Sequence, residues 1–88
     1  MTEIDVEAVG GNTYRVVVTD ATSSTSHEVT ASPGDMEALG GATPETLLEA
    51  SFRFLLDREP KESIMRNFDI TVISTYFPEY PTRIIDYL

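Results

Sequence analysis

The segment that most constrains the fold runs from Thr43 to Arg58, TPETLLEASFRFLLDR, because both of its ends carry helix signals. Thr43 can accept a hydrogen bond from a backbone N–H of the first turn, and Pro44 suits the first helical position. Pro60 stops the helix, since the residue before a proline is pushed out of the α region. The sequence therefore predicts one long helix over residues 43–58.

The apolar residues of this predicted helix spread over more than half of its circumference, at about 100° per residue. They are Leu47, Leu48, Ala50, Phe52, Phe54, Leu55 and Leu56. A helix with one buried face needs an apolar stripe only about 100° wide, so this helix is expected to contact two surfaces. In one interpretation these are a sheet and the C-terminal helices. In the other, Phe52 and Leu56 face a partner chain.

Alternation of apolar and polar residues predicts two strands ahead of the helix, over residues 2–9 and 13–19. Residues 10–12, Gly-Gly-Asn, join them in a turn, since these residue types tolerate positive φ. Arg15 would then lie across from the carboxylates of the first strand. A third strand is expected over residues 25–31, and the three form an antiparallel meander.

The segments on either side of the long helix carry weaker signals. Residues 32–42 are expected to form a glycine-containing connector, and residues 62–67 a short helix. The segment FDITVISTYF, residues 68–77, fits either a helix capped by Thr71 or a strand rich in β-branched residues. The helix is preferred, because the alternation fails part-way through the segment whereas the helical spacing continues. A strand over 68–76 is the alternative.

These elements predict an α+β fold. A three-stranded antiparallel meander packs against the helix over 43–58, and short helices complete the C-terminus. If the alternative holds, residues 68–76 add a fourth strand to the sheet. A chain of 88 residues has the size of one domain, so residues 1–88 are expected to fold as a single unit.

The net charge of -9 is distributed unevenly along the chain. Residues 1–49 hold nine acidic residues and a single base, Arg15, whereas residues 50–88 are nearly balanced. Binding to a nucleic-acid backbone needs clustered Lys and Arg, so the acidic half argues against nucleic acid as a partner. A basic protein partner remains compatible with this charge.

Composition also limits the compartment and the cofactors. The chain has no cysteine, which excludes disulfides and thiolate metal sites and fits a reducing compartment. No stretch approaches the eighteen apolar residues of a membrane span, and the N-terminus lacks the pattern of a signal peptide. We therefore expect a cytoplasmic protein that neither enters a membrane nor carries a metal or cofactor.

Few residues could carry out catalysis. His27 is the one histidine of the chain, and it has no second histidine or cysteine with which to form a metal site. A lone strand histidine is usually structural or solvated. Asp69 stands between Phe68 and Ile70, but a turn or cap role explains it more simply. The chain is expected not to be an enzyme, and an enzyme that uses carboxylates alone is the remaining catalytic alternative.

The aromatic residues near the C-terminus form the most unusual feature of the sequence. Tyr76, Phe77, Tyr80 and Tyr87 form a cluster interrupted by two prolines, a composition found both in recognition surfaces and in small cores. Together with Phe52 and Leu56 these aromatic residues could form one continuous apolar surface. The candidate interaction surface, for a different protein or for a second copy in a homodimer, consists of Phe52, Leu56, Tyr76, Phe77 and Tyr80.

One short pattern resembles a known family. A meander followed by G-x-T-x-E-x-L at the start of a helix, here Gly41, Thr43, Glu45 and Leu47, is similar to the HicB-type antitoxin domain. The Pro-Asp-x-Pro-Gly segment of that family is absent, and residues 32–35, Ser-Pro-Gly-Asp, stand in its place. The resemblance and the acidic first half suggest an alternative function, an antitoxin-like inhibitor of a basic nuclease. The main expectation is a non-enzymatic domain that acts through protein–protein contacts.

Overall fold

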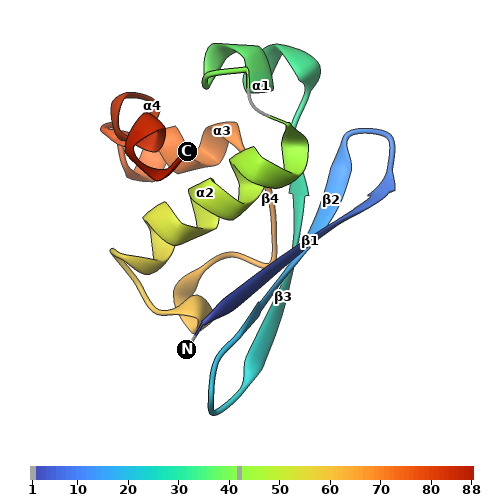
Figure 1. Ribbon diagram of the computed structural model, residues 1–88, viewed down its shortest axis with the longest axis vertical. Coiled ribbons are helices and arrows are strands. Elements are labelled where there is room, and N and C mark those ends of the chain that lie inside the picture. Colours follow the sequence, from blue (N-terminus) through green and yellow to red (C-terminus); the bar gives the residue numbers. More distant parts are fainter. Residues whose placement is uncertain (1, 42) are drawn as a thin grey trace.

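The computed structural model describes residues 2–41 and 43–88 and shows an α+β fold in which helices cover one face of a four-stranded sheet (Figure 1). The strands are β1 (Glu3–Gly10), β2 (Thr13–Thr19), β3 (Ser24–Thr30) and β4 (Asn67–Asp69), in the order β1-β2-β3-β4. The first three form the predicted antiparallel meander, and β4 runs parallel to β3. The meander and the alternative of a fourth strand are both confirmed.

The register of the first hairpin follows from the alternation in the sequence. Ile4 pairs with Val18 and Val6 with Val16, so the apolar side chains of both strands share the covered face. On the other face, Arg15 lies 3.8 Å from Glu7 and 3.9 Å from Glu28, as the sequence predicted for the first strand. These contacts are exposed, so each adds less than about 1 kcal/mol to stability.

A short helix that the sequence analysis missed lies within the predicted connector. Helix α1 (Pro33–Ala38) begins with a capping box, in which Asp35 N–H donates to Ser32 Oγ and Ser32 N–H donates to the Asp35 carboxylate. The signal was the one used for the long helix: a hydroxyl residue, then proline, then an acid in the first turn. Buried Met36 attaches α1 to the core.

Helix α2 (Pro44–Leu56) crosses the sheet and begins as predicted, with Thr43 at its N-cap and Pro44 in the first turn (Figure 1). Its wide apolar face is explained by contacts on two sides. Phe52 lies against His27 and Phe68, which belong to the sheet. The ring of Phe54 contacts three C-terminal rings: those of Phe77, Tyr80 and Tyr87. The interpretation that α2 packs between the sheet and the C-terminal helices is confirmed.

The helix expected over residues 62–67 is not formed. A single 3-10 turn, η1 (Lys61–Ser63), replaces it, and the chain then extends beside β3. Arg66 C=O accepts a hydrogen bond from Glu28 N–H at 2.7 Å, and Met65 C=O contacts the His27 ring at 2.8 Å. Because these carbonyl groups bond to β3, they are not directed along a helix axis as a helix over residues 62–67 would require.

Both interpretations of residues 68–77 hold for part of the segment. Strand β4 ends at Asp69, and helix α3 (Thr71–Tyr76) begins two residues later. The predicted Thr71 cap is wrong, because Thr71 donates through its N–H and its hydroxyl to Asp69 Oδ1, at 3.0 and 2.8 Å. Asp69 therefore has the turn role that the sequence favoured.

The C-terminus folds back onto α2 through α4 (Tyr80–Arg83) and the 3-10 helix η2 (Ile84–Tyr87). Tyr80 is fully buried, and its hydroxyl donates to Ser51 Oγ at 2.6 Å. Ser51 in turn donates to the Leu47 carbonyl at 2.7 Å, so both buried hydroxyls are satisfied. Burial raises the pKa of Tyr80 to about 12.

Candidate functional site

The structure separates the five residues of the candidate interaction surface. Phe52 and Tyr80 have no exposed area, so they belong to the core and leave the candidate surface. Leu56 and Phe77 are half-buried, whereas 65% of Tyr76 is exposed. Phe52 is buried because it faces the sheet. Tyr80 is buried because its hydroxyl is the hydrogen-bond partner of the buried Ser51 hydroxyl.

A groove forms where Tyr76 and Phe77 meet the end of α2, and we call it the α2–α3 groove. Its volume is about 490 Å³. The lining residues are Leu55, Glu59, Ser63, Met65, Phe68, Val72, Ile73, Tyr76 and Phe77. Most of them are apolar, and the volume lies within the range of about 300–1,000 Å³ typical of ligand sites.

Three elements position the groove. The end of α2 supplies Leu55, the extended segment before β4 supplies Met65, and α3 supplies Val72, Ile73 and Tyr76. Leu55, Phe68 and Ile73 are buried and hold the groove to the core. Met65 and Tyr76 are 40% and 65% exposed, so each presents an apolar side chain to solvent. Exposed apolar residues gathered around one groove often mark a binding site.

Among the residues that the structure describes, Glu59 is the one carboxylate that lines the α2–α3 groove. Within the described ranges no Lys or Arg forms an ion pair with it. Partial burial raises the pKa of this carboxyl above its ordinary value, because the charged form loses hydration. The groove therefore combines an apolar lining with one carboxylate that lacks a partner from the described chain.

Comparisons with known proteins provide no family for this arrangement. No protein-family model, curated protein or solved structure matches the chain. The likeness of residues 41–47 to the HicB-type antitoxin domain is thus not accompanied by a family match.

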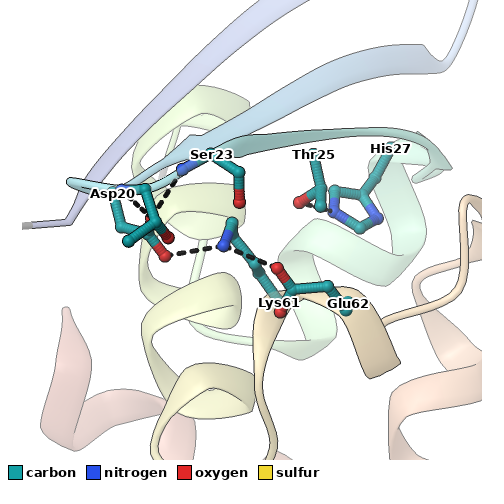
Figure 2. Close-up of polar contacts among 7 residues, drawn as sticks. Asp20, Ser23, Thr25, His27, Lys61 and Glu62 are labelled. Atoms are coloured by element: carbon teal, nitrogen blue, oxygen red, sulfur yellow. Dashed lines mark hydrogen bonds and ion pairs between the residues drawn. The ribbon is translucent and has the colours of Figure 1, made fainter.

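Beside the groove, Lys61 joins two distant parts of the chain (Figure 2). It is the one lysine of the sequence, and only 5% of its side chain is exposed. Its ammonium lies 2.6 Å from Asp20, which follows β2, and 2.7 Å from Glu62. The hydrogen bond to Lys61 is the main cause that lowers the pKa of Asp20, helped by bonds from Thr22 and Ser23. The same ion pair raises the pKa of Lys61.

The Lys61 contacts fix η1, which opens the segment that forms one wall of the groove. Sequence reasoning missed this role, because a lysine in a polar stretch is normally solvated. Because its pKa is raised, Lys61 stays an ammonium and is not a neutral nucleophile. Its role is to position the chain.

His27 occupies a structural position on β3. It is 1% exposed, packs against Phe52 and lies within hydrogen-bond distance of Thr25 and Met65 (Figure 2 draws the Thr25 contact). The carbonyl of Met65 can only accept, so His27 Nδ1 carries the proton, and Nε2 accepts from the Thr25 hydroxyl. Burial is the main cause that lowers the pKa of His27, and Arg66 adds to it.

This buried histidine predicts a loss of stability in mild acid. The unfolded chain binds a proton below about pH 6.5, whereas folded His27 has a lowered pKa and binds it less readily, so stability rises with pH as the pH approaches 6.5 from below. We expect the free energy of unfolding to fall by up to about 1.4 kcal/mol per pH unit below pH 6.5. Urea unfolding between pH 5 and pH 8 measures this slope.

The variant His27→Gln is the comparison for this prediction. It retains Glu59, whose raised pKa gives a slope of the opposite sign, so the difference between the two slopes belongs to His27. The variant is expected to lose most of the slope between pH 5 and pH 6.5. An equal slope in both proteins would contradict the prediction.

Across residues 2–41 and 43–88, no three His, Cys, Asp or Glu residues are grouped so that they could hold a metal ion. None of the described helices has the length and apolar character needed to cross a membrane.

Proposed function

We propose that the protein is a small non-enzymatic domain that acts through protein–protein contacts in the cytoplasm, with the α2–α3 groove as its contact site. The observation that carries this proposal is the exposure of Tyr76 and Met65 on a groove lined by apolar residues. Tyrosine is among the residues that most often dominate binding energy at interfaces. The absence of cysteine fits a reducing compartment such as the cytoplasm.

Charge indicates the kind of partner. Glu59 lines the groove without a cation from the described chain, and the protein carries a net charge of -9. A second copy of the chain would bring the same negative charge and would be repelled. The proposed occupant is therefore a segment of a different protein that presents apolar side chains next to one Lys or Arg. The apolar side chains fill the groove, and the basic residue pairs with Glu59.

A selection with random 12-residue peptides displayed on phage tests this proposal. The enriched peptides are expected to combine large apolar residues with a Lys or Arg. Their affinities would then be measured by calorimetry for the wild-type protein and three variants. Tyr76→Ala is expected to weaken binding about 30-fold, as for an interface hot spot. Glu59→Gln is expected to weaken it about three- to tenfold, since it removes the charge that pairs with the basic residue.

Ile85→Ala is the matched control, because Ile85 is 70% exposed but does not line the groove. It is expected to change the affinity less than twofold. The proposal fails if no peptide is enriched, if the enriched peptides lack apolar residues, or if they bind Tyr76→Ala as well as the wild type. A dimer that Tyr76→Ala dissolves would place a second copy in the groove and would likewise overturn the proposed partner.

Two other functions predicted from the sequence stay predictions. An antitoxin-like inhibitor of a basic nuclease would use acidic residues on the sheet rather than the groove. An enzyme that uses carboxylates alone would need a second acid beside Glu59, and the described part of the chain places no other acid in the groove lining.

A further inference from the structure

Strand β1 leaves one edge of the sheet open. It stands first in the sheet order and pairs with β2 on one side only. Within the described ranges, no backbone hydrogen bond from a turn or loop reaches residues 3–9. The outward N–H and C=O groups of an edge strand are a ready template for another extended chain.

Several of the usual protections of an edge strand are missing from β1. Natural edges are commonly short, or they carry charged side chains (Lys above all), Pro, a bulge or an inward-pointing charge. Strand β1 has eight residues and contains neither Lys nor Pro, and its irregularity lies between Ala8 and Gly10, beyond its regular part. The opposite edge, β4, has only three residues. The β1 edge is therefore the longer template of the two.

Helix α2 covers its face of the sheet only partly at β1. Ile4 and Val6 pair with Val18 and Val16, which are fully buried, yet Ile4 and Val6 themselves are only half-buried. Helix α2 thus leaves an apolar row partly open beside the edge. An added strand would cover this row if its side chains on that face were apolar.

The opposite face of β1 carries charge. Glu3, Asp5 and Glu7 are all exposed, and the base within ion-pair distance is Arg15, 3.8 Å from Glu7. Two copies joined along β1 would place carboxylates beside carboxylates, and like charges on neighbouring strands are destabilising. The charge pattern of this edge therefore fits a basic strand and opposes a second copy.

We propose that the β1 edge is a second docking surface, which binds an extended segment of a partner protein in which basic and apolar residues alternate. The segment adds a strand beside β1 and forms main-chain hydrogen bonds with it. Its apolar side chains cover Ile4 and Val6, and its Lys or Arg side chains lie across from Glu3, Asp5 and Glu7. This surface is distinct from the α2–α3 groove and does not depend on it.

A synthetic peptide provides the test. The probe has seven residues that alternate lysine and valine, with acetyl and amide ends. The control peptide has the same composition with the lysines and valines in separate blocks. Binding would be followed by NMR titration and by hydrogen exchange of the β1 amides. The alternating peptide is expected to bind more tightly than the block peptide and to slow the exchange of amides in residues 3–8.

Two charge-reversal variants distinguish docking at the β1 edge from general electrostatic attraction between the basic peptide and the acidic protein. Asp5→Lys changes the β1 edge, whereas Glu37→Lys makes the same change in net charge at an exposed position on α1. Asp5→Lys is expected to lower the affinity for the alternating peptide about three- to tenfold, and Glu37→Lys to lower it less than twofold. The proposal is overturned if the alternating peptide does not bind or does not protect the β1 amides from exchange. It is also overturned if the block peptide binds as tightly as the alternating one, or if Asp5→Lys and Glu37→Lys weaken binding equally.

Discussion

Replacement of Phe54 by alanine is expected to lower the free energy of unfolding by about 3–5 kcal/mol. Phe54 is fully buried and contacts the rings of Phe77, Tyr80 and Tyr87, and the Arg58 guanidinium lies 3.6 Å from the centre of its ring. The substitution removes a large apolar side chain and leaves a cavity in the middle of this cluster. Urea unfolding of both proteins measures the difference.

The location of the effect is as informative as its size. Because all three rings that Phe54 contacts follow α3, hydrogen exchange is expected to accelerate first in residues 77–88. Ile85→Ala, at a 70% exposed position in the same region, is the control and should cost less than about 0.5 kcal/mol. A loss below about 1 kcal/mol for Phe54→Ala would mean that the C-terminal cluster does not stabilise the fold.

Phe52→Ala is expected to cost a similar amount, about 3–5 kcal/mol, through the other side of α2. The Phe52 ring lies 5.3 Å from that of His27 and 6.2 Å from that of Phe68, so the cavity opens against the sheet. Urea unfolding measures the loss. NMR titration of the single histidine adds a local measurement, because the cavity exposes the imidazole.

The pKa of His27 is expected to rise toward its ordinary value in Phe52→Ala, since burial is the main cause that lowers it. In Phe54→Ala the pKa of His27 should stay at its wild-type value, because Phe54 contacts the C-terminal rings and not the histidine. If the two variants shifted the pKa of His27 equally, the conclusion that Phe52 and Phe54 pack on separate sides of α2 would be wrong.

Much of the fold could be predicted from the sequence because its signals are local. The cap at Thr43, the first-turn Pro44 and the alternation of the meander act over a few residues, and the structure contains all of them. The apolar circumference of α2 was wide enough to require two contact surfaces. Helix α1 was missed although it begins with a comparable local signal, a serine cap followed by proline.

The candidate site could not be predicted as well, because its formation depends on contacts between distant residues. Met65 is placed by a hydrogen bond between its carbonyl and His27, which is 38 residues away in the sequence. That bond draws residues 64–66 out of the expected helix and onto the flank of β3. Their aromatic side chains beside prolines identified Tyr76 and Phe77 as candidates. No local pattern indicated that Tyr80 would be buried in the core as the donor to Ser51.

The parallel pairing of β3 with β4 has a consequence for the order of assembly. The hairpins of the meander close short turns, whereas β4 reaches β3 only after α1, α2 and η1 have intervened in the chain. Closing a longer loop costs more chain entropy, so we expect this pairing to form after the hairpins, with α2 already docked on the sheet. Met65, Phe68 and Val72 reach their places only through that closure. The α2–α3 groove is therefore expected to be absent from any partly folded state that lacks β4, and a partner that recognised the groove would bind the completed fold selectively.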